Sequence, residues 1–146
     1  MIRKILFIII CFFSVYAFSQ EAFDKNTIIG TSCFYSGRQT KIILQFERLI
    51  KNKNEKEIRK KLFSSKKEER LLSAKILGFL ASKKSITLSK EEEIQQNNIK
   101  NSNDEVFICS GCSFINKVKT KDFFSPTLKN NQVLLESWLH IKLENF

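Results

Sequence analysis

The sequence is poor in the residues that interrupt regular structure, since its 146 residues include one proline and four glycines. Sandwiches and barrels built from many short strands need frequent turns, which these two residues commonly supply. Their scarcity disfavours a turn-rich all-β fold and favours helices. Histidine is also scarce. His140 is its single copy, so any Ser-His-Asp or Cys-His catalytic arrangement would depend on that residue.

The sequence also lacks the short motifs of several common chemistries. No serine lies in a Gly-x-Ser-x-Gly elbow, and there is neither a glycine-rich phosphate loop nor an HExxH pair. Glutamates gather at Glu68-Glu69 and Glu91–Glu93, both at expected helix starts. Capping and the helix dipole already account for carboxylates in such places. We therefore predict a non-catalytic protein that needs no cofactor.

The first residues have the pattern of a secretory signal peptide. A basic start precedes nine apolar residues (5–13), and Ala17 and Ser19 are small residues at the −3 and −1 positions of a cut before Gln20. The apolar stretch 5–18 is shorter than the roughly 20 residues of a membrane-spanning helix. We expect residues 1–19 to be removed and the mature chain to be periplasmic or secreted, without an integral membrane segment. An uncleaved tether is the alternative.

The chain is basic, with 25 lysine and arginine residues against 15 acidic ones and a formal net charge of +10. The lysines are spread along the sequence and arginine is scarce, whereas a nucleic-acid interface needs a concentrated patch and often uses arginine to read bases. Export would also separate the chain from nucleic acids. We therefore expect no nucleic-acid partner. An acidic protein surface is the favoured partner, and an anionic envelope surface is the alternative.

Apolar spacing predicts four helices between residues 38 and 100. Ile42, Phe46 and Ile50 belong to one stripe of the first helix. The second covers about 55–63. The third extends to about residue 81 and is apolar around most of its circumference, which indicates a central helix. Gly78 within it should be a close packing point, because glycine weakens a helix unless a neighbour needs the space.

Two Ser-x-x-Glu patterns predict the starts of the third and fourth helices. Ser65 to Glu68 and Ser89 to Glu92 both have capping-box spacing, and Phe63 could form a hydrophobic staple at the first. The fourth helix has few apolar residues, chiefly Ile94 and Ile99. It should therefore pack at the edge of the domain.

The remaining chain predicts a short extended segment at 106–108, a turn at 123–126 and a last helix over 133–146, with a strand at 139–143 as the alternative. The fold expected is an all-α or helix-dominated single domain over residues 38–146, preceded by an ordered loop at 20–37. Its four central helices would pair into two stacked αα-hairpins, loosely similar to HEAT-type helical repeats. Two units are too few for a solenoid.

Three cysteines would remain after cleavage: Cys33, Cys109 and Cys112. Cysteines of exported proteins usually pair. The first interpretation is a structural disulfide from Cys33 to Cys109 or Cys112. By restricting the unfolded chain, it would stabilise the fold by roughly 4 kcal/mol. The second is a redox pair of Cys109 and Cys112, since a CxxC motif permits a reactive thiolate. The third is a zinc site formed by the three cysteines and His140.

These observations predict a non-catalytic exported binding module. It would contact another protein through a helical surface or through the cysteine-tethered loops 33–37 and 109–114. An inhibitor or immunity-type role fits a small, exported helical domain without recognisable catalytic motifs. An extracytoplasmic thiol-redox protein using Cys109 and Cys112 is one alternative, and a structural zinc-binding domain is the other.

Overall fold

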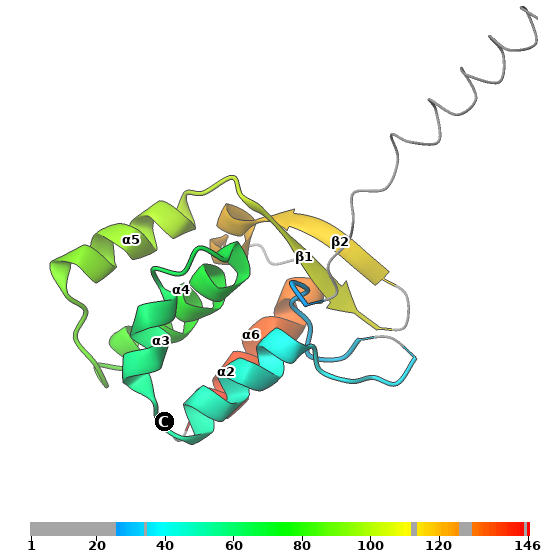
Figure 1. Cartoon of the computed structure of the whole chain (residues 1–146), viewed down its shortest axis with the longest axis horizontal. Coiled ribbons are helices and arrows are strands. Elements are labelled where there is room, and N and C mark those ends of the chain that lie inside the picture. The colour runs from blue at the N-terminus through cyan, green and yellow to red at the C-terminus, as the bar shows by residue number, and fades with distance from the viewer. Residues whose placement is uncertain (1–25, 34, 112–113, 126–129, 145) are drawn as a thin grey trace, which may run out of the picture.

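The computed structural model describes residues 26–33, 35–111, 114–125, 130–144 and 146 (Figure 1). The predicted signal peptide lies outside these residues. The described chain is dominated by helices and carries one small two-stranded sheet. The elements are α2 (Lys41–Lys51), α3 (Glu55–Lys61), α4 (Lys67–Ser82), α5 (Lys90–Lys100), β1 (Glu105–Ser110), β2 (Phe114–Lys119), the 3-10 helix η1 (Thr120–Phe124) and α6 (Asn130–Leu143).

This arrangement confirms a helix-dominated fold, and the sheet makes the all-α variant wrong. The HEAT-like stacking stays a prediction. Within the described residues, no helix is long and apolar enough to cross a membrane.

Helix α4 is central, as its apolar circumference predicted. It contacts α2, α3, α5 and α6. Gly78 is the close packing point expected of it, because a Cβ added there would lie 2.9 Å from Nε2 of Gln96 on α5. That Gln96 amide donates a 2.9 Å hydrogen bond to the Ala74 carbonyl, so α5 approaches α4 through a polar contact.

One of the two predicted capping boxes is present. Ser89 Oγ accepts a hydrogen bond from the Glu92 backbone N–H at 3.2 Å, and Glu92 Oε2 accepts one from the Ser89 N–H at 2.8 Å. The predicted box at Ser65 is wrong. Helix α4 begins at Lys67, its N-cap residue is Lys66, and no side chain caps it.

The start of α4 is organised by other contacts than the sequence indicated. Ser64, one residue earlier than expected, accepts a 3.1 Å hydrogen bond from the Lys66 N–H and donates a 2.7 Å one to Glu69. Glu68 is buried instead of reaching back to a capping residue. Phe63 is 54% exposed and forms no buried staple.

The sheet is a hairpin of β1 and β2 that the sequence revealed only in part. The two strands pair antiparallel, with Glu105 opposite Lys119 and Ser110 opposite Phe114. The sequence predicted an extended segment at 106–108 but no partner for it. On the other side of β1, the Ile29 N–H donates to the Phe107 carbonyl and the Ile29 carbonyl accepts from the Cys109 N–H, both at 2.9 Å. Part of the predicted N-terminal loop therefore lies against the sheet as a short parallel bridge.

Helix α6 begins at Asn130, three residues before its predicted start, and the alternative of a strand at 139–143 is wrong. It packs on α2, α4 and β1. Its inward face contributes four buried residues to the main core: Leu135, Trp138, Leu139 and Leu143. The predicted turn at 123–126 begins inside η1, whose Phe123 is fully buried.

Candidate functional site

The face of α6 that points away from the core also carries apolar side chains. Val133 and Leu134 are 45% and 46% exposed, and Ile141 is 67% exposed. A helix that packs on one side needs one apolar stripe, with polar residues opposite it. The fold therefore uses one face of α6 and leaves apolar residues on the other.

Two hollows adjoin the carboxyl end of α6. The first lies between α2 and α6 and has a volume of about 360 Å³, and it is lined by Glu47, Ile50, Lys51, Lys53, Ile141, Lys142 and Phe146. The second lies between the end of α4 and α6 and has a volume of about 420 Å³, and it is lined by Phe79, Leu80, Lys83, Ser85, His140, Ile141, Leu143, Glu144 and Phe146. We call the two together the C-terminal hollows. They share the exposed Ile141 and the partly buried Phe146, so apolar side chains line both hollows where they adjoin.

Lysines outnumber carboxylates around the C-terminal hollows, with four lysines and two glutamates in the described lining. Lys51, Lys53 and Lys83 are exposed. The Nζ atom of Lys83 lies 5.7 Å from the centroid of the Phe79 ring. The carboxyl ends of α2, α4 and α6 favour nearby cations and account for part of this enrichment. The surface that results is apolar at its centre and basic at its rim.

Two of the residues that line the first hollow form an ion pair. Lys142 of α6 binds Glu47 of α2. The hydrogen bond from Lys142 lowers the pKa of Glu47 below its usual value, against the opposing effect of partial burial, and Gln39 contributes in the same direction. Glu47 is therefore ionised at neutral pH and joins α2 to α6.

His140 lies on the second hollow. Its ring meets that of Phe79 edge-on, with 4.8 Å between the centroids. The structure does not bring His140 together with Cys33 and Cys109, and across the described ranges no cluster of three histidine, cysteine or acidic residues could hold a metal ion. Cys112, the remaining member of the predicted zinc set, lies outside those ranges.

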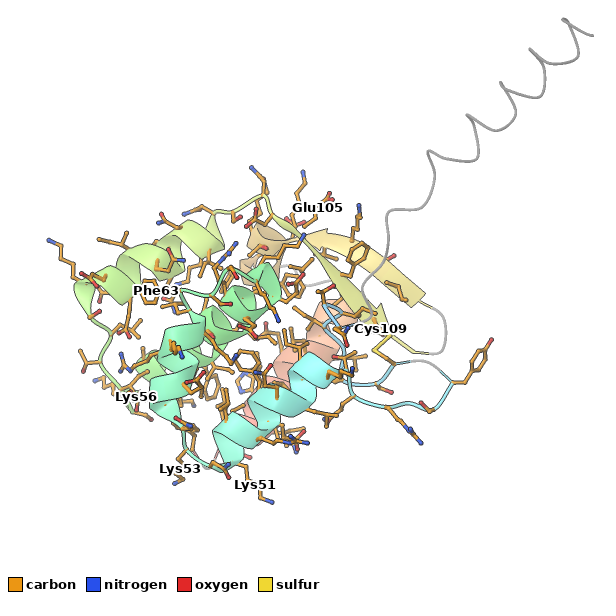
Figure 2. All side chains as sticks on the ribbon, viewed as in Figure 1. Lys51, Lys53, Lys56, Phe63, Glu105 and Cys109 are labelled. Carbon is orange, nitrogen blue, oxygen red and sulfur yellow. A yellow bond between two sulfur atoms is a disulfide. The ribbon has the colours of Figure 1, made fainter. Side chains whose placement is uncertain are left out.

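Cys33 and Cys109 are together at the other end of the fold. Their Sγ atoms lie at disulfide distance, and their Cα atoms are 5.6 Å apart, within the range of natural disulfides. Both residues are buried. In Figure 2, Cys109 lies far from Lys51 and Lys53 at the rim of the first hollow.

The cysteine-tethered loops form a separate surface. Cys33 and Arg38 pair through backbone hydrogen bonds of 2.8 and 3.1 Å, which closes a small loop between them. Gly37 has φ +60° in this loop, and Tyr35 is 91% exposed. Only part of the predicted 109–114 contact loop is described, because residues 112 and 113 fall outside the described ranges.

Three described carboxylates have a clearly shifted pKa, and each shift is downward. Besides Glu47, these are Glu69 and Glu92, in which the effect of partial burial is outweighed by hydrogen bonds from Ser64 and Lys61 to Glu69, and from Arg59 and the Ser89 N–H to Glu92. A lowered pKa keeps a carboxylate charged at neutral pH, whereas a general acid needs a raised one. These three groups therefore serve as ion-pair anchors.

Sequence reasoning missed the C-terminal hollows, although one signal for them is present. Val133, Leu134 and Ile141 fall outside the inward stripe formed by the buried residues of α6. That surplus predicts an exposed apolar face once the direction of packing is known. Comparisons of the chain with protein families, with curated proteins and with solved structures found no match.

Proposed function

We propose that this chain is an exported, non-catalytic binding module that holds another protein at the C-terminal hollows. The observation that carries this proposal is Ile141, an isoleucine 67% exposed between two hollows. An exposed apolar residue flanked by concave surface and rimmed by polar residues is a common arrangement at protein interfaces. The export part of the proposal rests on the signal-peptide pattern at residues 1–19.

Charge favours an acidic partner. Lysines form most of the charged rim, and the whole chain has a formal net charge of +10. An acidic surface would approach faster and dock more specifically than a basic one, because complementary potentials steer association. An inhibitor or immunity-type role would use such a contact to cover a surface of the partner.

The proposal gives the cysteines a structural role. A bridge between Cys33 and Cys109 would tie the N-terminal segment to the sheet. The burial of both residues favours a structural disulfide and disfavours a reactive thiol pair. The redox alternative would need Cys109 to pair with Cys112 instead. The zinc alternative would need His140 to lie beside the cysteines, and its packing on Phe79 gives that alternative no support.

A photocrosslinking amino acid placed at position 141 tests the proposed interface. In cells that export the protein, we expect a discrete protein adduct from this position, because the side chain would enter the contact. Position 94 on α5 provides a matched control, since Ile94 is 53% exposed but lies on another surface. It should give no such adduct.

The binding proposal fails if position 141 gives no protein adduct, or if positions 94 and 141 give the same adducts. Lipid adducts at position 141 would also contradict it, and they would favour an anionic envelope surface over a protein.

A further inference from the structure

Glu68 is a buried glutamate whose carboxylate has no partner among the described residues. It is the second residue of α4 and is 4% exposed, yet no described group forms a hydrogen bond or an ion pair with its side chain. The next residue behaves differently, since Glu69 binds both Lys61 and Ser64. A largely enclosed carboxylate that pairs with no described group is uncommon in a native structure and requires an explanation.

Two hollows meet at this carboxylate. One has a volume of about 250 Å³ and lies between α2 and the start of α4, with Lys41 in its wall. The other has a volume of about 380 Å³ and extends to Phe107 of β1. Thr27, Lys66 and Glu68 line both. Glu68 therefore borders space that a small molecule can enter.

The same place offers sites for a negative group. Helix α4 has sixteen residues, and no side chain caps its amino end, unlike α3 and α5, which are capped by Asn54 and Ser89. Its first backbone N–H groups and the positive end of its dipole favour an anion. Lys66 lines both hollows and forms no ion pair with a described carboxylate, although its charge helps to lower the pKa of Glu69, which lines the first hollow.

We infer that these hollows bind a zwitterionic α-amino acid. Its ammonium group would hydrogen-bond to the Glu68 carboxylate, and its carboxylate would lie at the amino end of α4 beside Lys66. A simple cation would be repelled by Lys41 and Lys66, and a simple anion by Glu68. A zwitterion satisfies both parts of the site at once: its ammonium group meets the Glu68 carboxylate, and its carboxylate meets Lys66 and the amino end of α4. This inference is independent of the protein contact proposed at the C-terminal hollows.

Nuclear magnetic resonance titration of the folded protein with three probes tests the inference. L-alanine carries both charges, N-acetyl-L-alanine lacks the ammonium group, and L-alaninamide lacks the carboxylate. We expect alanine to shift the backbone signals of residues 66–69. Each of the other probes should bind about tenfold or more weakly, because each loses a charge-assisted hydrogen bond.

Glu68→Gln tests the ammonium half while preserving the shape of the side chain. It should weaken alanine binding about tenfold or more, whereas the binding of the anionic N-acetyl-L-alanine should not weaken and should rise, because the repelling carboxylate is gone. Its melting temperature should not fall, because no described group pairs with the Glu68 carboxylate. Glu91→Gln is the matched control, since Glu91 is the second residue of α5 and is exposed. It should bind alanine as the natural chain does.

The double substitution Lys66→Gln and Lys67→Gln tests the other half and needs no change at Glu68. It should weaken alanine binding, whereas the binding of the cationic alaninamide should not weaken and should rise, because two repelling cations are removed. The inference is wrong if alanine causes no shifts, if alaninamide binds as tightly as alanine, or if Glu68→Gln binds alanine normally. A large fall in the melting temperature of Glu68→Gln would also overturn it, by showing that the carboxylate is structural.

Discussion

Gly30 determines how closely the N-terminal segment approaches the paired cysteines. A Cβ at this position would collide with Cys33 Sγ and would lie 2.8 Å from the Cys109 carbonyl oxygen and 3.1 Å from its Cβ. The Gly30 carbonyl also accepts a 3.0 Å hydrogen bond from the Thr40 N–H. The residue is therefore held between the cysteine pair and the start of α2, where a side chain has no space.

Gly30→Ala should lower the free energy of unfolding by about 1–3 kcal/mol, the usual cost of overpacking a buried site. Urea unfolding under non-reducing conditions measures this change. In a Cys33→Ala background the cost should shrink, because the main colliding atom is absent, and the two substitutions then show a coupling energy. Gly111→Ala is the control for backbone strain, since Gly111 has φ +72° and open space around its Cβ position. An equal effect of Gly30→Ala in both backgrounds would contradict the proposed collision.

At the scale of elements, charged contacts join α3 to its neighbours. Lys61 of α3 binds Glu69 of α4 at 3.0 Å, and both side chains are nearly buried. Arg59 of α3 binds Glu92, the glutamate of the α5 capping box. Helix α5 has a mostly polar surface and buries one isoleucine, Ile99. Its position therefore depends on these polar contacts more than that of the other helices.

The ion pairs make stability depend on pH in a defined direction. The folded-state pKa values of Glu69 and Glu92 lie below the usual value of 4.5. The stability that they contribute is present above that value and is lost as the pH falls through the folded-state pKa values. Glu69→Gln should lower the free energy of unfolding at neutral pH by about 1–3 kcal/mol. As the pH falls, the free energy of unfolding of this variant should decrease less steeply than that of the natural chain. Urea unfolding at a series of pH values measures both effects.

The exposed Glu93 provides the control for this prediction, because it takes part in no described ion pair. Glu93→Gln should leave both the free energy of unfolding at neutral pH and its decline in acid nearly unchanged. A Glu69→Gln variant that declines in acid as steeply as the natural chain would contradict the role given to this carboxylate.

The sequence predicted the elements whose signals are local. The stripe of Ile42, Phe46 and Ile50 and the capping box at Ser89 depend on residues a few positions apart, and both are present. The hairpin was missed because the apolar residues of β2 (Phe114–Lys119) do not alternate regularly with polar ones, so the strand is defined by its pairing with β1. The capping box predicted at Ser65 is absent for a related reason. Glu69 is drawn to Lys61 on another helix, a contact that local spacing does not reveal.

The candidate sites depend still more on tertiary placement. The excess apolar residues of α6 were visible in the sequence, but their exposure depends on which face meets α2 and α4. Glu68 looked like a capping residue, and its isolation appears only when the N-terminal segment and α2 are placed around it. Sequence reasoning identified the cysteines as a group. The structure places Cys109 beside Cys33, while Cys112 lies outside the described residues.

The whole molecule contains two apolar clusters of unequal size. The larger contains residues of all five helices from α2 through α6 and of β1 and η1, in one core. The smaller consists of Ile28, Cys33 and Cys109, with Phe107 and Ile115 packed against it. This smaller cluster attaches the N-terminal segment to the sheet, and the C-terminal hollows belong to the larger one. Breaking the cysteine pair should therefore weaken one end of the molecule and leave the proposed binding surface in place.

Cys33→Ala should lower the free energy of unfolding by about 2–4 kcal/mol, because a bridge between residues 76 positions apart would restrict the unfolded chain strongly. Hydrogen exchange should accelerate at residues 28–33 and in β1, while α2 and α6 keep their protection. Cys112→Ala is the matched control and should leave stability unchanged if Cys112 takes no part in the bridge. Peptide mapping without reduction should find Cys33 linked to Cys109. A Cys109–Cys112 link, or equal losses of stability in the two variants, would overturn the structural clamp and return the CxxC pair to consideration as a redox site.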